Sequence, residues 1–512
     1  MPKYLLLTAF LAVLCAACTR HPAVPDDFHT HDRLPVLRPD YTDVVVPPNI
    51  APLNFKVMES SEECVAVVTL PDGTQTTYGK GNQVCFPLKT WRKMLEAAKG
   101  KDITIQIYAK DAINEWHQYK PFTLSVAEEE IDEYCSYRLI SPSYVAYEML
   151  LIAQRNLTNF EEKEIYNNMI ISSEKTGQCI NCHSYQNYGT DNMQFHMRQG
   201  FGGTMIVRDG HPYKVDLKTD STISSGVYPT WHPTLPVIAY STNSTGQSFH
   251  TKSRAKIEVE DSKSDLIFYD VERNEVSKIA AADDEFEVFP WWAPDGKMLY
   301  FCSAHFEMND SMEAEAQVIE RYKEIKYDIF RKTFNPDTYE FGPTELVYSA
   351  SSRRRSATLP RISPDGRYLL FGQGYWGCFH VWHPEADLYI TDLKTLRTRK
   401  LENVNSPDAE SYHSWSSNGR WILFVSRRDD GNYSRLYIAY FDKQGRGHKA
   451  FELPQEDPDF YDFFLRSYNV PEFMTEPVKI SAQEFVSVAK TDAKKATFVS
   501  HPTGPKKMKS EE

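Results

Sequence analysis

The chain is long, acidic and rich in aromatic residues. Its 512 residues include 13% Phe, Trp and Tyr and 25% charged residues, and its formal net charge is -13. This length and composition suffice for several packed cores, whereas the acidic balance provides no basic surface for nucleic acid. We therefore expect a multidomain globular protein with no nucleic-acid partner.

The N-terminus has the order of an export signal. Lys3 is followed by an apolar run over residues 4–14 and by small residues directly before Cys18. This is the order of an n-region, an h-region and a cleavage site, and the run is shorter than the ~20 residues that span a bilayer. We predict a lipoprotein signal peptide over residues 1–17 and lipidation of Cys18, with a transmembrane anchor as the alternative. The expected location is the bacterial cell envelope, on the periplasm-facing side of the outer membrane.

Residues 18–40 and 41–128 differ in pattern. The first segment contains four prolines without apolar periodicity, which is typical of a linker. In the second, short β-type runs alternate with turn signals such as Pro71-Asp72-Gly73, and only residues 90–98 have helical spacing. We expect an immunoglobulin-like β-sandwich over residues 41–128.

The chain has five cysteines besides the two near the N-terminus and the pair at 179 and 182. Five is an odd number, so in an oxidising compartment they cannot all pair with one another. Cys64 and Cys85 lie in neighbouring predicted strands. We expect these two to form a disulfide.

Between residues 129 and 200 the apolar period changes to that of a helix. Tyr144, Tyr147 and Leu151 fall on one helical face, and residues 160–173 continue at the same spacing. We therefore predict a helical segment that leads into the next motif.

Residues 179–183 read Cys-Ile-Asn-Cys-His. Two thiols at this spacing can each add to a vinyl group of haem, and the adjoining imidazole can bind the iron. A zinc site would need two further Cys or His ligands at compact spacing, and a redox dithiol would need a βαβ context; neither is nearby. A structural disulfide is a further alternative. The pentad predicts one covalent haem c at Cys179 and Cys182, with His183 as the proximal iron ligand.

The residues that follow offer a sixth iron ligand. His196 is the first candidate, and Met193 and Met197 are the alternatives; a thioether ligand would raise the reduction potential relative to a second imidazole. Arg198 could pair with a haem propionate through two parallel N–H donors. For each of these residues, core packing or an ordinary surface position is the competing interpretation.

Four copies of one pattern, an apolar or aromatic residue, a turn and a strand, follow residue 226. They cover residues 231–241, 292–303, 362–371 and 415–426. Pro-Asp-Gly and Asn-Gly supply the turn conformations, and a second hairpin follows each copy. Four strands per copy predict β-propeller blades over residues 201–476. We expect six blades, with five or seven as alternatives, long inserts at 251–264 and 306–326, and a flexible Lys-rich tail over 477–512.

These repeats resemble the TolB-type, WD40-like β-propeller repeats of bacterial envelope proteins. The whole span from Tyr134 to Phe473 resembles a family of Gram-negative lipoproteins that join such a propeller to a CxxCH segment. The motifs that carry the resemblance lie at residues 137–142, 179–184, 195–198, 414–421 and 468–473. The resemblance implies a mainly β, TolB-like architecture and a haem site more than it implies an activity.

Two functions from different classes follow. The first is an envelope lipoprotein that holds one c-type haem against a propeller and transfers electrons to or from a protein partner. The alternative is a non-catalytic propeller scaffold that binds an envelope protein or a glycan. A haem enzyme such as a peroxidase is a third hypothesis, and no Gly-x-Ser-x-Gly elbow, P-loop or HExxH motif favours a hydrolase or nucleotide enzyme.

Overall fold

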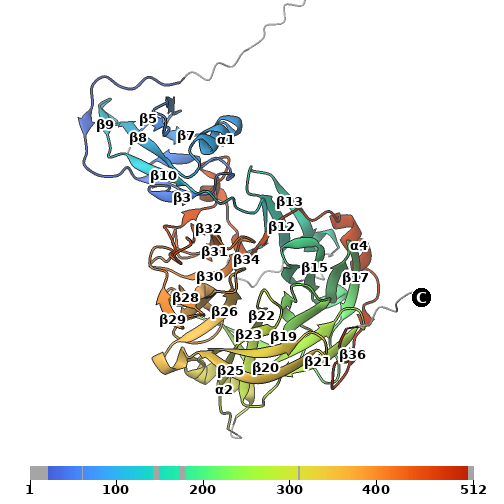
Figure 1. Ribbon diagram of the computed structural model, residues 1–512. Coiled ribbons are helices and arrows are strands. Elements are labelled where there is room, and N and C mark those ends of the chain that lie inside the picture. The colour runs from blue at the N-terminus through green and yellow to red at the C-terminus, as the bar shows by residue number, and fades with distance from the viewer. Residues whose placement is uncertain (1–20, 60, 142–148, 172–178, 310–311, 506–512) are drawn as a thin grey trace, which may run out of the picture.

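The computed structural model describes residues 21–59, 61–141, 149–171, 179–309 and 312–505. Figure 1 shows a small β-domain, in blue, beside a larger ring of sheets that runs from green to red. Among the described residues, none of the helices has the length and apolar character needed to cross a membrane. Cys18 and the signal segment lie outside this part of the chain.

The N-terminal domain contains two sheets that share one core with a helix. The seven-stranded sheet comprises β1 (His29–Thr30), β3 (Val44–Val46), β5 (Glu63–Thr69), β6 (Gln75–Tyr78), β8 (Asp102–Lys110), β9 (Trp116–Gln118) and β10 (Phe122–Val126). The three-stranded sheet comprises β2 (Leu37–Arg38), β4 (Phe55–Val57) and β7 (Gln83–Val84). The helix α1 (Leu88–Ala97) buries Trp91, Met94 and Leu95 on one face, as its sequence spacing predicts.

Two predictions for this region are wrong. Strands β1 and β2 lie inside the segment predicted as a linker, because both pair with strands far along the sequence. Cys64 and Cys85 are free thiols: Cys64 is buried in the core, whereas Cys85 is exposed. Neighbouring strands alone therefore did not place the two sulfur atoms together.

The segment before and around the CxxCH motif is also different from its prediction. Instead of helices, its described residues form β11 (Tyr134–Ile140), β12 (Leu151–Asn156), β13 (Glu162–Asn167), β14 (Ile180–Gln186) and β15 (Gly189–Met197). Five of the six residues of β12 are buried, so both faces of this strand are covered. An apolar run without alternation cannot be told from a buried helix by its period, which explains the error. Tyr144 and Tyr147 lie outside the described residues.

The larger domain is a six-bladed propeller, which confirms the predicted fold and blade number. The first blade contains β13, β12, β11 and β34 (Ser467–Met474), and the second contains β14, β15, β16 (Gly203–Arg208) and β17 (His211–Asp216). The third contains β18 (Val227–Trp231), β19 (Val237–Phe249), β20 (Ile257–Asp270) and β21 (Glu275–Ala280), and the fourth contains β22 (Glu285–Trp292), β23 (Met298–His305), β24 (Asp328–Asn335) and β25 (Glu340–Tyr348). The fifth contains β26 (Ser356–Ile362), β27 (Tyr368–Gly374), β28 (Asp387–Asp392) and β29 (Arg397–Lys400), and the sixth contains β30 (Glu410–Trp415), β31 (Trp421–Ser426), β32 (Arg435–Tyr440) and β33 (Phe451–Glu452).

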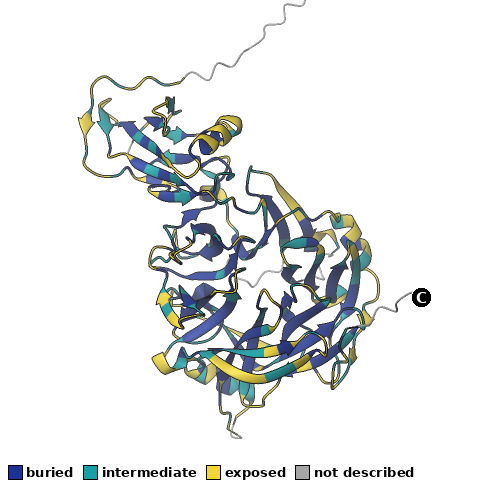
Figure 2. Cartoon of the chain, in the orientation of Figure 1, coloured by how far each residue is buried: buried dark blue, intermediate teal, exposed yellow. Residues whose placement is uncertain are grey.

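The ring is closed by strands from opposite ends of the domain. Strand β34 pairs antiparallel with β11, so that Tyr134 lies opposite Met474. The inner strands β34, β14, β18, β22, β26 and β30 contact one another in this order around the ring. The propeller therefore begins at β11 rather than at residue 201, and the CxxCH segment belongs to its second blade. Figure 2 shows that the strands around the ring are mostly buried.

Every inner strand carries the same irregularity. Its register with the neighbouring strand shifts beside a residue other than glycine that has a φ between 46° and 54°, and β14 has one further shift near its end. These six bulge residues are Cys182, Tyr228, Phe289, Leu359, Tyr412 and Val470. The residue after each is a proline in four blades and a histidine, His183 or His413, in the other two. The last two residues of the CxxCH motif therefore occupy a repeated position of the propeller.

The described part of the C-terminal tail packs on the ring, so the prediction of a flexible tail is wrong up to residue 505. Helix α4 (Ala482–Ala489) packs the fully buried Phe485 against the neighbouring rings of Tyr166 and Phe195. Strands β35 (Lys494–Lys495) and β36 (Thr497–Phe498) then pair with β17 and β21. The prediction followed the many lysines of this segment. It overlooked the apolar residues between them, of which Phe485, Val486 and Ala489 are buried.

The two inserts lie on the propeller as connections. Most of residues 251–264 extends β20 into a long hairpin with β19, and residues 306–326 contain the helix α2 (Ala314–Arg321). The remaining helix, α3 (Phe460–Phe463), precedes β34. Short 3-10 turns occur at Asn168–Ile170, Gln199–Phe201, Tyr322–Glu324, Ser351–Arg353 and His380–Trp382.

Candidate functional site: an axial pocket that contains the CxxCH thiols

Two cavities meet along the axis of the ring. All six bulge residues line the narrower one, a waist of about 410 Å³. Four of them, Cys182, Tyr228, Tyr412 and Val470, also line a wider, partly open pocket of about 980 Å³, which we call the axial pocket.

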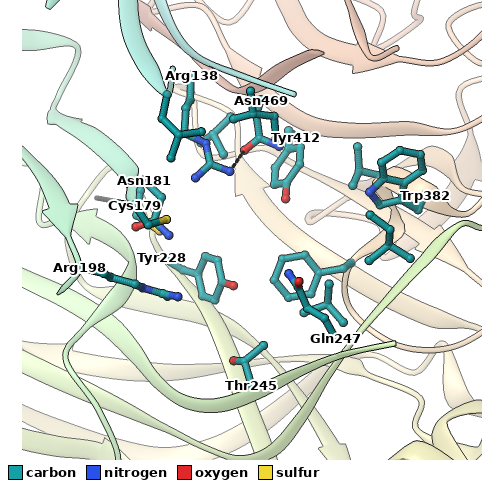
Figure 3. A pocket seen from close by; sticks show the side chains of 18 residues that line it. Arg138, Cys179, Asn181, Arg198, Tyr228, Thr245, Gln247, Trp382, Tyr412 and Asn469 are labelled. Atoms are coloured by element: carbon teal, nitrogen blue, oxygen red, sulfur yellow. Dashed lines mark hydrogen bonds between the residues drawn. The ribbon is translucent and has the colours of Figure 1, made fainter. Parts of the chain in front are cut away.

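Both cysteines of the CxxCH motif line the axial pocket, and Figure 3 shows Cys179 there. Cys179 lies directly before β14, where its backbone N–H donates to Gln199 Oε1 at 2.9 Å. Cys182 is the bulge residue of the same strand, and each cysteine is 7% exposed. Burial raises the pKa of the Cys182 thiol, which keeps it protonated in the protein without a ligand.

Two arginines line the same pocket. Arg138 on β11 donates to Ile180 O at 3.0 Å and to Asn469 Oδ1 at 3.2 Å, while its buried Nε has no hydrogen-bond partner. Arg198 follows β15 and is exposed at the pocket. Figure 3 shows both guanidinium groups near Cys179, one on each side of it in this view. The pocket therefore combines two thiols with two cations.

His183 lies at the waist and not in the axial pocket. Its ring is 1% exposed, and neither nitrogen reaches hydrogen-bond geometry with another group. Burial, together with the charge of Arg138, lowers the pKa of His183 to about 3. The imidazole is thus neutral at pH 7, and it belongs to the residue next to Cys182, which lines the pocket.

The predicted sixth ligands are elsewhere. Met193 and Met197 are fully buried in the apolar core shared by the first two blades. His196 faces Thr204 Oγ1 through Nδ1 at 3.2 Å, and burial followed by the charge of Arg198 lowers its pKa to about 3. None of the three lines the axial pocket. The structure therefore brings Cys179, Cys182 and Arg198 together and leaves these candidates inside the blade.

Sequence reasoning missed several pocket residues. Arg138 was not singled out, because it precedes the motif by about 40 residues and reaches it only through the ring. Tyr228 and Tyr412 line the pocket as bulge residues, and the recurring dipeptide of an aromatic or apolar residue before Pro or His is the signal that marks them. Trp382 lies at the far side, with the guanidinium carbon of Arg427 3.1 Å from its ring centre.

A buried charged pair supports the hairpin that covers this end of the channel. Glu258 on β20 is 3.0 Å from Nε2 of His383, and both side chains are almost fully buried. Burial alone would lower the pKa of His383. Hydrogen bonds and charge from Glu258 and Glu385 nevertheless raise this pKa to about 9. His383 is therefore a cation at neutral pH and ties β20 to the fifth blade.

The three repeated tryptophans have structural roles. Trp231, Trp292 and Trp415 are at most 5% exposed. Trp415 donates to Arg361 O at 3.2 Å in the neighbouring blade. These tryptophans pack the blades together, as their repeated position in the sequence predicts.

The axial pocket fits a c-type haem in two respects. Two cysteines at CxxCH spacing line one cavity, and two guanidinium groups are available for carboxylates. The imidazole of His183 adjoins the motif but lies at the waist, and the described residues place no imidazole or thioether in the axial pocket itself. The groups of the pocket therefore suit attachment through thiols and charge pairing, whereas a haem iron would have to reach His183 at the waist.

Together, the fold and the pocket define the class: a six-bladed β-propeller with an N-terminal β-sandwich and a thiol-bearing axial pocket. No family model matches the sequence, and no curated protein matches it either. Among solved structures, the chain is similar to TolB from Acinetobacter baumannii, with 12% identity, a TM-score of 0.39, and 72% of this chain and 79% of that chain covered. It is also similar to a hypothetical selenium-binding protein from Sulfolobus tokodaii, with 8% identity, a TM-score of 0.38, and 85% and 96% covered.

Proposed function

We propose that the axial pocket holds one covalently attached c-type haem and that the protein transfers electrons to or from a partner in the bacterial envelope. One observation carries this proposal: both cysteines of the CxxCH motif and two arginines line a single pocket. When bound, the group supplies a one-electron couple at its iron. The chain's part is attachment, orientation and tuning.

Each residue of the site has a definite task in this proposal. Cys179 and Cys182 provide the two thioether bonds, and Arg138 and Arg198 pair with the propionates. His183 offers its imidazole, which burial already keeps neutral. The narrower waist on that side of the pocket is lined by the six bulge residues and also by His183, Arg361 and Glu472.

The expected localisation follows the same logic. Covalent haem is attached outside the bacterial cytoplasm, and the segment before Cys18 has the order of a lipoprotein signal. The acyl anchor would hold the protein at the membrane, and the open end of the axial pocket would face a redox partner.

A second function is favoured by a different observation. Cys182-His183 occupies the repeated bulge position, and His413 occupies the same position in a blade that has no CxxCH motif. His413 Nε2 donates to Leu359 O at 2.7 Å in the neighbouring blade, which is a purely structural role. The second candidate is therefore a propeller scaffold that binds an envelope protein or glycan and needs no haem.

The deciding experiment is production of the chain with and without haem-attachment machinery. The proposal expects a pyridine haemochrome spectrum and an intact mass increased by one haem, and both disappear in the Cys179→Ala/Cys182→Ala variant. Cys302→Ala is the matched control, because this buried thiol on β23 does not line the axial pocket. An unmodified mass in the presence of active machinery would refute the haem and leave the scaffold, which predicts that the double variant still binds its partner.

A further inference from the structure

A cluster of metal-ligating side chains lies on the N-terminal domain, far from the axial pocket. Strand β1 pairs in parallel with β9, so that His29 lies opposite His117. Because side chains alternate along a strand, His29 and His31 lie on one face and Thr30 on the other. The ring centres of His29 and His31 are 5.6 Å and 5.1 Å from that of His117. Three imidazoles are therefore gathered on one edge of the sheet.

Two carboxylates complete the cluster. Asp111 and Glu115 belong to the turn between β8 and β9, and their oxygens and a ring nitrogen of His117 lie within 4.8 Å of one another. His117 Nε2 is 3.0 Å from Asp111 Oδ2, and His29 Nε2 is 3.3 Å from Glu115 Oε2. Every oxygen and nitrogen in this set is of a type that binds zinc.

The carboxylate of Asp111 is held in place by the backbone. Its Oδ1 accepts the N–H groups of Ile113 at 3.0 Å and Glu115 at 2.9 Å. The other oxygen, Oδ2, is thereby directed at His117. One carboxylate oxygen anchors the turn and the other remains available to a cation.

The histidines form a chain in which one proton can be replaced. His31 Nε2 lies 3.0 Å from His117 Nδ1, and His117 Nε2 faces Asp111. Without a metal, His117 donates from Nε2 to Asp111 and accepts from His31 at Nδ1. A cation at Nε2 would release that proton to solvent; His31 would then pass its Nε2 proton to His117 Nδ1 and take a proton from solvent at its own Nδ1, so that His117 Nδ1–H donates to His31 Nε2. An imidazole with such a partner on its second nitrogen is the usual arrangement of a metal ligand.

We propose that this cluster is a Zn²⁺ site. His117 Nε2 and one oxygen each from Asp111 and Glu115 are the ligands that already lie within 4.8 Å of one another. His29, whose Nε2 is 3.3 Å from Glu115 Oε2, turns toward the ion as the fourth ligand, and His31 is the outer partner of His117. Two carboxylates neutralise the charge of a divalent ion, and two imidazoles favour zinc over Ca²⁺ or Mg²⁺, which take oxygen ligands. Four protein ligands correspond to a closed, structural site.

The site would fix strand β1. This strand has only two residues and two register pairs with β9, so backbone pairing alone holds it weakly. A metal bond from His29 to the turn at residues 111–115 joins this strand to the sandwich.

The test is a titration of the full mature chain with Zn²⁺ against a chromophoric chelator. All proteins carry Cys179→Ala and Cys182→Ala, so that zinc at the CxxCH thiols does not contribute. One tight site is expected, weakened at least tenfold in His117→Ala and in His29→Ala. His31→Ala is expected to weaken it by about 10- to 100-fold, the effect of removing an outer partner. Ca²⁺ is expected to leave the chelator signal unchanged.

Two control variants make the result specific. His211 is exposed on β17, and His305 belongs to a separate group with Asp284 and Glu285. Neither His211→Ala nor His305→Ala should change the affinity for zinc. Equal affinity in His117→Ala and the parent protein, absence of a stoichiometric site, or loss of the site in His305→Ala would each overturn the assignment. Circular dichroism of each variant verifies that the fold is retained.

Discussion

Replacement of His183 by proline separates the structural role of its position from a role in haem binding. The equivalent residue is a proline in four of the six blades, and residues 182 and 183 have no register partner on β15. Proline therefore suits the backbone at this point. Its fixed φ and missing N–H cost nothing where the chain is already bulged.

The size of the effect follows from the burial of the ring. At pH 8, a proline that fits its site stabilises a protein by about 0.4–1 kcal/mol through the entropy of the unfolded chain. The pKa of His183 is lowered from 6.5 to about 3 on folding. Only the unfolded state then gains a proton below pH 6.5, so stability is lost as the pH falls. Over the 1.5 units from pH 6.5 to pH 5, at about 1.36 kcal/mol per unit, the loss is about 2 kcal/mol.

The assay is urea unfolding of the haem-free protein at pH 8 and pH 5, followed by tryptophan fluorescence. We expect His183→Pro to be slightly more stable at pH 8 and to reduce the difference between the two pH values by about 2 kcal/mol. His413→Pro is the control: it removes the hydrogen bond to Leu359 O, so it should lose about 1–3 kcal/mol at pH 8. Destabilisation of His183→Pro by more than about 1 kcal/mol at pH 8 would refute the equivalence of the six positions.

Three further predictions test other parts of the structure. Phe485→Ala should cost about 3–5 kcal/mol and expose residues 481–505 to trypsin, because this ring is fully buried under α4; unchanged proteolysis would contradict the packing of the tail. The Glu258–His383 pair should stabilise the protein fully below pH 6.5 and progressively less up to pH 9, because the pKa of His383 is raised on folding; thermal unfolding of Glu258→Gln should show a smaller decline, because only Glu385 then remains beside His383. Native protein should be alkylated at Cys85 but not at Cys64, whose pKa is raised to about 12 by burial. If Cys85 reacts only after a reductant is added, the two cysteines form the disulfide that the sequence predicted.

The blades could be predicted because their signals are local. A turn such as Pro294-Asp295-Gly296 and the strand after it are adjacent in sequence, so each copy can be recognised alone. The first blade gave no such signal, because its inner strand is supplied by residues 467–474. Strand β12 was mistaken for a helix for a related reason: neighbouring elements from distant sequence cover both its faces. Long-range pairing also explains the errors at β1 and β36.

Part of the candidate site could be predicted in the same way. The spacing of Cys179 and Cys182 indicated that both thiols face one cavity, and Arg198 reaches it from the next strand. His196 is equally close in sequence, but it faces Thr204 inside the blade. Distance along the chain does not reveal which side of a strand a residue occupies when a bulge intervenes. Arg138 belongs to another blade, and only ring closure brings it to the thiols.

Because of strand β34, the first blade of the ring is not the first to be completed during synthesis. Blades two to six are each built from a continuous stretch of chain, whereas the first blade waits for a strand that is made almost last. A polypeptide that ends before residue 467 would leave the edge of β11 unpaired, and an unpaired edge strand is prone to proteolysis and aggregation. Only a chain that extends through β34 can cover this edge.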